Sequence, residues 1–96
     1  MEFEWNERKR EKNLRDHKVD FIDAALIFEN QHFSKIDDRE DYGEERWVSL
    51  GMVDGQVYVV VHTERDGVTR IISAWKGSTN ERESYYARVF GGCSDP

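Results

Sequence analysis

The sequence predicts a small α+β domain in which helices cover one face of an antiparallel sheet. Two Asp-Gly pairs, at residues 54–55 and 66–67, each stand between stretches in which apolar and polar side chains alternate. A type I′ turn needs positive φ at both central residues, so Asp-Gly in this setting favours a two-residue β-hairpin. Capping residues and apolar side chains at helical spacing, before and after these hairpins, predict the helices.

Composition indicates one small domain with a large charged surface, which we place at residues 1–90, followed by a flexible tail at 91–96. Of the 96 residues, 35% are charged and 38% hydrophobic. We expect no membrane span and no signal peptide, because no long apolar stretch and no basic start followed by an apolar segment is present. The single cysteine, Cys93, cannot form an internal disulfide, which favours the reducing cytoplasm.

The first third of the chain is expected to be mostly helical. Residues 2–5 can form a short strand, and Asn6 is a good N-cap for a charged helix that ends near His17. Asp20 is expected to cap a second helix. Its apolar side chains recur at helical spacing and should face the sheet: Phe21, Ala24, Ala25 and Phe28.

The rest of the chain is expected to supply the sheet and a closing helix. Strands are predicted at residues 31–36, 46–53, 57–65 and 68–76. Ser78 and Glu81 have the spacing of a capping box, which predicts a helix from about residue 79 to 90.

The two hairpin turns define which side chains share a face of the sheet. The first turn pairs Trp47 with His62, and the second pairs Arg65 with Val68 and, further along, Tyr58 with Trp75. One predicted face is apolar: Val48, Leu50, Met52, Val57, Val59, Val61, Ile72 and Ala74. The other is mixed and aromatic: Trp47, Ser49, Gly51, Tyr58, Val60, His62, Glu64, Thr69, Ile71, Ser73 and Trp75.

The mixed face has the residue types that single-stranded RNA requires. Aromatic rings stack on bases, and cations around them hold phosphate. A histidine and a carboxylate on one strand can exchange protons with a ribose 2′-hydroxyl, while an arginine stabilises charge on the phosphate oxygens. The predicted catalytic residues are His62, Glu64, Arg65 and Arg70. The predicted RNA-binding residues on and around this face are Arg46, Trp47, Trp75 and Lys76. No zinc spacing or glycine-rich nucleotide loop is present, so we expect no metal and no cofactor.

A structural interpretation of the same residues stays open. His62, opposite Trp47, is equally consistent with a packed, hydrogen-bonded histidine. Glu64 lies beside a turn, where carboxylates are commonly solvated. Trp47 and Trp75 could instead pack under the closing helix, whose Tyr85 and other aromatic residues need cover.

The acidic excess of the chain lies in one segment. The net charge is −6, which argues against nucleic acid as a partner. Residues 19–45 contain nine acidic and two basic side chains, most of the acidic ones in the run at 37–45. The run is consistent with a solvated loop or with a contact for a basic partner.

Several segments, in order, resemble the BrnT family of type II toxin–antitoxin toxins. The segments are residues 3–17, residues 19–25, Glu45-Arg46 with Gly51, Thr63-Glu-Arg65, Arg70-Ile-Ile-Ser-Ala74, and Glu81-Arg82 with Tyr85. The resemblance implies a RelE-like fold and a toxin that cleaves RNA and so arrests translation and growth. It also implies a BrnA-type antitoxin, which binds operator DNA as a complex with the toxin. Carried over by position, it favours Glu64, Arg65, Arg70, Lys76 and Arg82 as site residues.

One position departs from the family pattern. After Ile-Ile-Ser-Ala the family usually has an arginine, whereas this chain has Trp75. Tryptophan can stack on a base, but it cannot neutralise a phosphate. The first hypothesis is therefore an active ribonuclease toxin. The second is a catalytically impaired module that binds the antitoxin and acts in operon autoregulation. A third is an RNA-stacking protein without an antitoxin.

Overall fold

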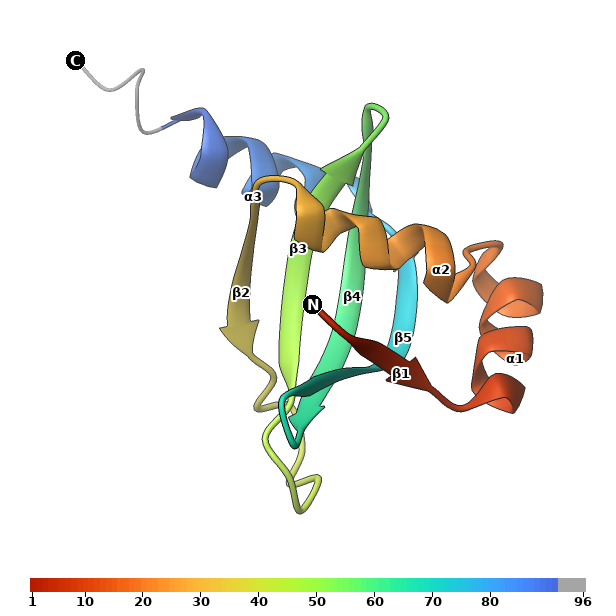
Figure 1. The fold of residues 1–96 in the computed structure, drawn as a ribbon. Helices are drawn as coiled ribbons and strands as arrows, with labels where there is room; N and C mark the ends of the chain where they lie inside the picture. Colours follow the sequence, from red (N-terminus) through yellow and green to blue (C-terminus); the bar gives the residue numbers. More distant parts are fainter. Residues whose placement is uncertain (92–96) are drawn as a thin grey trace.

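The computed structural model describes residues 1–91, which form a five-stranded sheet with helices on both faces (Figure 1). The predicted α+β fold class is confirmed. Residues 92–96, most of the predicted tail, lie outside the described part. In chain order the elements are β1 (Phe3–Trp5), α1 (Glu7–His17), α2 (Phe21–Ala24), the 3-10 helix η1 (Ala25–Glu29), β2 (His32–Ile36), β3 (Trp47–Val53), β4 (Gln56–Arg65), β5 (Val68–Lys76) and α3 (Thr79–Val89).

The strands lie in the order β1-β5-β4-β3-β2. Strands β2 to β5 form an antiparallel meander, as predicted, but β1 pairs with β5 in parallel, so the sheet is mixed. The parallel pair follows from the connection: α1, α2 and η1 carry the chain across the sheet from the β1 edge to the β2 edge (Figure 1).

Both Asp-Gly turns have the backbone that the sequence predicts. Asp54 and Gly55 have φ of 49° and 81°, and Asp66 and Gly67 have φ of 53° and 80°. Positive φ at both central residues is the signature of a type I′ turn. Through the first turn the predicted register is confirmed, with Trp47 opposite His62.

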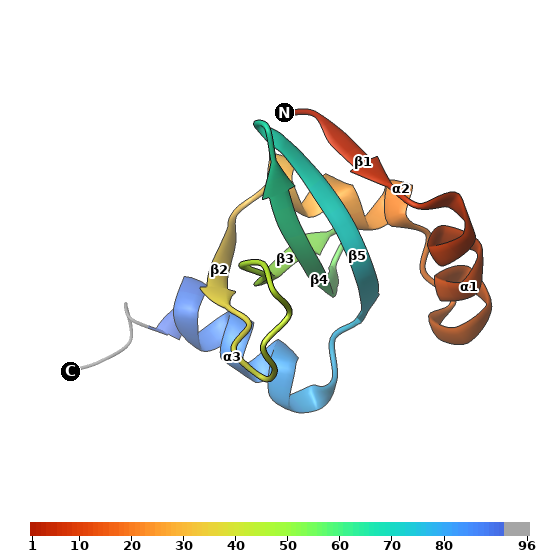
Figure 2. The same ribbon diagram turned by 90° about the horizontal axis from the view of Figure 1, so that it is seen from below.

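Helices α2 and η1 cover one face of the sheet, which we name the α2 face (Figure 2). The core on this face consists of Val19, Phe21, Ala24, Ala25, Ile27, Val60, Ile71 and Ala74. The predicted sheet-facing side of the second helix is thus confirmed. Gly51 of β3 allows η1 to approach closely, because a Cβ atom on Gly51 would lie only 2.6 Å from Cβ of Ile27.

Helix α3 covers the opposite face, which we name the α3 face (Figure 2). Leu50, Val57, Val59 and Tyr85 are buried there, with Phe33, Val48, Met52, Trp75 and Val89 packed around them. The predicted capping box is confirmed: the Ser78 side chain accepts from the Glu81 N–H, and the Glu81 carboxylate accepts from the Ser78 N–H. Each face therefore has its own core, and α2 and η1 cover the face that the sequence predicts to be mixed.

A β-bulge corrects the predicted register of the second hairpin. Near the turn, His62 lies opposite Ile71 as predicted, but Val61 then lies opposite Ser73, which leaves Ile72 unpaired. The predicted pairs Val60–Ser73 and Tyr58–Trp75 are therefore wrong. The observed pairs are Val61–Ser73, Val60–Ala74, Val59–Trp75 and Tyr58–Lys76. One extra residue in a strand reverses the face to which every later side chain points. Trp75 and Ser73 therefore lie on the α3 face, and Ala74 and Lys76 on the α2 face.

Asn13 of α1 gives a physical reason for the bulge. Its buried side-chain amide donates to the carbonyl oxygen of Ala74 at 2.8 Å and accepts from the Ala74 N–H at 3.1 Å. It also donates to the carbonyl oxygen of Val19 at 2.9 Å. Strand β1 pairs only with residues 69–71, so Asn13 takes the place of a strand partner beyond its end. A contact across 61 residues cannot be read from local sequence.

Candidate functional site

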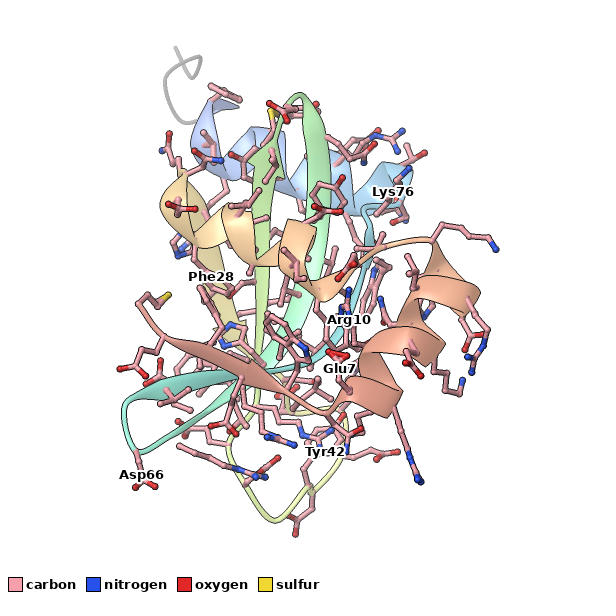
Figure 3. All side chains as sticks on the ribbon, turned by 45° about the vertical axis from the view of Figure 1, so that its right-hand side comes forward. Glu7, Arg10, Phe28, Tyr42, Asp66 and Lys76 are labelled. Carbon is pink, nitrogen blue, oxygen red and sulfur yellow. The ribbon has the colours of Figure 1, made fainter. Side chains whose placement is uncertain are left out.

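The predicted site residues lie at two ends of the sheet. The end formed by the loop at residues 37–46 and the β4–β5 turn holds Arg46, Trp47, His62, Glu64, Arg65 and Arg70. Trp75, Lys76 and Arg82 lie toward the other end. Figure 3 shows this separation, with Lys76 far from Tyr42 and Asp66. Alternation along β4 divides the first group further: Arg65 points to the α3 face, and His62 and Glu64 to the α2 face.

On the α3 face, Glu44 bridges two of the predicted arginines. Its Oε1 accepts from Nη2 of Arg65 at 2.9 Å, and its Oε2 accepts from Nε of Arg46 at 3.3 Å. The guanidinium of Arg46 also lies over the Tyr42 ring, 4.1 Å from its centroid. The hydrogen bond from Arg65 is the main cause of a lowered pKa of Glu44. An anion is therefore already held between these two arginines.

Arg70 extends this cationic surface toward β1. It lies opposite Thr63 in the β4–β5 ladder, on the same face as Arg65. Its Nη1 donates to Oε2 of Glu4, its neighbour on β1, at 2.5 Å. We name Arg46, Arg65 and Arg70 the arginine cluster. Each member is held by a carboxylate that stays partly accessible to solvent.

The acidic run at residues 37–45 is folded onto itself rather than simply solvated. Buried Asp37 accepts from Nε and Nη2 of Arg39 at 2.7 and 2.8 Å, which lowers the Asp37 pKa to about 2. The Tyr42 hydroxyl donates to the same carboxylate at 3.3 Å. Oγ1 of Thr63 donates to the backbone carbonyl of Glu45 at 2.7 Å, which ties the loop to β4.

Sequence reasoning missed Glu44 and Tyr42 as members of this cluster. A signal for Glu44 was present: continuing the β3–β4 register back from Trp47 opposite His62 places residue 44 opposite Arg65. Nothing comparable indicates Tyr42, because its contact with Arg46 depends on how the loop folds.

On the α2 face, at the same end, lies a pocket of about 380 Å³, which we name the His62 pocket. It is open between η1, the chain start and the ends of the strands. Its lining contains three of the predicted site residues, and the full set is Met1, Phe28, His32, Ser34, Glu45, Trp47, His62, Glu64 and Thr69. The structure thus brings Trp47, His62 and Glu64 together, but without the arginine cluster.

His62 itself is packed and neutral. It is only 6% exposed, and its ring lies edge-on to Phe28 with centroids 5.1 Å apart. Nε2 lies 2.6 Å from Oγ of Ser49, which in turn lies 2.6 Å from Oγ of Ser34. Burial, and secondarily His32, lower the His62 pKa to about 4. Nδ1 is buried and has no hydrogen-bond partner within residues 1–91.

Glu64 and Trp47 are the accessible members of the pocket. Glu64 is exposed, and its Oε1 accepts only a long hydrogen bond, 3.5 Å from Oγ1 of Thr69. Trp47 is half-buried and does not pack under α3, so the packing interpretation fails for it. In the part of the chain that is described, neither Glu64 nor Glu45 forms an ion pair.

The remaining predicted residues have structural contacts on or near α3. Trp75 lies on the α3 face, and its indole N–H donates to Oε1 and Oε2 of Glu81 at 3.2 and 3.3 Å. The predicted placement of Trp75 on the same face as His62 is wrong because of the bulge, whereas its packing against α3 is confirmed. Arg82 donates to the backbone oxygen of Gly77 at 3.1 Å. Lys76 is exposed.

Residues 5–81 match a family described as "Ribonuclease toxin, BrnT, of type II toxin-antitoxin system". The chain belongs to this family. BrnT-family membership implies an RNA substrate and an antitoxin partner, and the resemblance read from the sequence is confirmed. A search of curated proteins found no sequence that matches the chain.

Two further observations on the described residues concern membranes and metal ions. None of the helices within residues 1–91 has the length and apolar character needed to cross a bilayer. Over the same residues, no three His, Cys, Asp or Glu side chains come together in a group that could hold a metal ion.

Proposed function

We propose that this BrnT-family chain is an endoribonuclease that inhibits translation and growth and is neutralised by a BrnA-type antitoxin, the complex of the two binding operator DNA. The observation that carries the enzymatic part is the bridge of Glu44 to Arg46 and Arg65. Two guanidinium groups that converge on one carboxylate form an anion site, and the natural anion for an RNA-cleaving protein is the backbone phosphate.

Accessibility favours exchange of Glu44 for phosphate. The side chain of Arg65 is 53% exposed, and those of Arg46 and Glu44 are 23% and 27% exposed. Ion pairs at this level of exposure contribute little to stability, because solvent competes for both partners. A phosphate can therefore take the guanidinium groups without unfolding the loop.

The proposed reaction is attack of the ribose 2′-oxygen on the adjacent phosphorus, with departure of the 5′-oxygen. Arg46 and Arg65 stabilise the charge that grows on the non-bridging oxygens. Glu44, which pairs with both arginines, accepts the 2′-hydroxyl proton, and a water molecule protonates the departing 5′-oxygen. Once phosphate holds the arginines, the cause of the lowered Glu44 pKa is removed, which makes this carboxylate a stronger base.

The earlier candidates for the base, His62 and Glu64, stay predictions. Both lie on the α2 face, on the other side of the sheet from the arginine cluster. His62 is also buried, with a pKa near 4, which makes it a weak proton acceptor.

Kinetics of Glu44→Gln test this mechanism. Without the competing charge, the variant should bind RNA more tightly and lower KM. Without the base, kcat should fall by about 10²–10⁴-fold. Glu40→Gln, an exposed acid in the same loop, should leave both constants unchanged. An unchanged kcat in Glu44→Gln together with a large loss in Glu64→Gln would return the base to the α2 face.

Expression of the wild-type chain without its antitoxin tests the function itself. Bacterial growth should slow and cellular RNA should be cut, and co-expression of the antitoxin should reverse both. Normal growth and intact RNA at high levels of folded chain would refute the enzymatic proposal.

A second candidate function is the catalytically impaired module that retains antitoxin binding. The observation that favours it is Trp75, which lies on the same face as the arginine cluster and donates its indole N–H to Glu81 instead of adding a cation. Trp75→Arg should raise RNA cleavage and toxicity at least tenfold if this interpretation is right. Trp75→Phe is the matched control, because it removes the hydrogen bond to Glu81 without adding charge.

A further inference from the structure

The His62 pocket takes no part in the phosphate chemistry proposed above, and its lining suits a different ligand. We propose that it binds a guanine base and so gives the protein a preference for RNA next to guanine. The inference rests on the proposed function only where RNA is the source of the base. The volume of the His62 pocket, about 380 Å³, lies within the range of about 300–1,000 Å³ common for small-molecule sites.

Aromatic side chains form the walls of the pocket. Trp47 and Phe28 line it together with His32, whose ring lies 5.1 Å from that of Phe28. Trp47 is half-buried, which leaves part of its indole accessible. Proteins that take up unstacked bases stack them on such rings. The walls therefore select a flat aromatic ligand.

Charge at the rim selects against phosphate. No Arg or Lys belongs to the lining, whereas Glu45 and Glu64 both do. Ionised carboxylates only accept hydrogen bonds, so the rim favours a ligand whose edge carries several hydrogen-bond donors. Guanine presents N1–H and the N2 amino group side by side, and one carboxylate can accept from both. Adenine, cytosine and uracil lack this pair of adjacent donors.

One lining residue of the pocket, His62, has a buried atom that lacks a hydrogen-bond partner in residues 1–91. The atom is the ring nitrogen Nδ1. Buried polar atoms without partners cost free energy, and a donor or acceptor from another molecule can supply the missing partner. When Ser49 donates to Nε2, neutral His62 carries its proton on Nδ1, and guanine O6 can accept that proton once the base displaces the side chains that cover Nδ1.

One short segment links this pocket to the arginine cluster. Glu44 and Arg46 point to the α3 face and Glu45 to the pocket, so consecutive side chains lie on opposite sides of the same sheet end. An RNA strand that crosses this end can place a base in the pocket and a neighbouring phosphate at the cluster.

Binding of short RNAs that resist cleavage tests the proposal. The probes are labelled 2′-O-methyl pentanucleotides, four uridines around a central G, inosine, A, C or U, followed by fluorescence anisotropy. The G probe should bind about tenfold more tightly than the A, C and U probes, which is within the range of one bidentate base contact. Inosine, which lacks the N2 amino group, should fall between. Equal binding of all five probes would overturn the proposal.

Carboxylate variants locate the preference. Glu45→Gln with Glu64→Gln should abolish the preference for G while the protein stays folded, because both side chains are exposed. Glu83→Gln, an exposed acid on α3, is the matched control and should keep it. A preference that survives the double variant would refute recognition by these carboxylates.

Two further experiments distinguish RNA from free guanosine as the source of the base, and the guanine pocket from the proposed function. Competition by guanosine as effective as the G pentanucleotide would identify the free nucleoside as a ligand, whereas competition by the oligonucleotide alone would identify RNA. Arg65→Ala should weaken binding of all five probes by one factor and keep the G preference. G-selective binding without any RNA cleavage would refute the proposed function alone, and cleavage without base preference would refute the guanine pocket alone.

Discussion

The two sides of one sheet end handle charge in opposite ways. On the α3 face, the arginine cluster keeps its charges partly exposed and holds each against a carboxylate. On the α2 face, His62 is buried, neutral and hydrogen-bonded to a serine. Arg65 on one side and His62 on the other both belong to β4, where side chains of successive residues point to opposite faces.

This difference assigns different physical work to each side. Exposed ion pairs exchange readily for another anion, because each charge is already solvated in part. Protonation of a buried neutral ring costs free energy, so such a ring is suited to recognise a ligand by its shape and its hydrogen bonds. The predictions below test whether the α3 face binds phosphate through its charges and the α2 face recognises a base.

Among the changes that compare the two sides, removal of Arg65 should have the largest effect on cleavage. Arg65→Ala takes away one of the two groups that stabilise the charged transition state, and loss of one such donor costs about 10²–10³-fold in kcat. Arg8→Ala is the control, because Arg8 is an exposed cation on α1, outside the arginine cluster. Steady-state cleavage of a labelled RNA measures both. Equal losses in the two variants would mean that only overall charge matters.

Acid should weaken the fold through His62. The unfolded chain takes up this proton near pH 6.5, but the folded chain only near pH 4. Protonation of His62 therefore leaves the free energy of unfolding unchanged above pH 6.5. As pH falls from 6.5 toward 4, it lowers the free energy of unfolding by about 3 kcal/mol. Urea titrations at several pH values should show this loss for wild type and a smaller one for His62→Gln. Parallel pH profiles would mean that His62 takes up its proton at the same pH in the folded and the unfolded chain.

Asn13 should control which face residue 75 joins. Asn13→Ala leaves the buried N–H and carbonyl of Ala74 without their partner. Each unsatisfied buried group costs about 1–3 kcal/mol, so the variant should lose at least about 2 kcal/mol of stability. Asn80→Ala, exposed on α3, should change stability little. Equal stability of the two variants would show that the bulge forms without Asn13.

The bulge also marks where sequence reasoning stops. The Asp-Gly turns, the cap at Asn6 and the capping box at Ser78 are local signals, and each has the predicted geometry. The register holds from the turn back to His62 and fails one residue later, where a side chain from α1 intervenes.

That single shift decided how much of the candidate site could be foreseen. Residues near the turns, such as Trp47 and Glu64, lie on the face that sequence predicted. Trp75 lies beyond the bulge and therefore on the wrong face in the prediction. The pairing of Glu44 with Arg65 follows from the register, but the fold of the loop that carries Glu44 depends on buried Asp37 and on Tyr42. No periodicity reports such contacts.

The salt dependence of RNA affinity should show the smallest difference between the arginine cluster and the His62 pocket, and it should distinguish them best. Each phosphate contact with single-stranded RNA contributes about −0.7 to the slope of log K against log salt. Arg65→Ala should therefore make the slope less negative by about 0.7. Trp47→Ala should weaken binding through lost stacking, by about 1–3 kcal/mol per base, and leave the slope unchanged. Anisotropy titrations of a 2′-O-methyl RNA at four salt concentrations measure both quantities. A change of slope in Trp47→Ala would place phosphate at the His62 pocket, and the division of work between the two faces would fail.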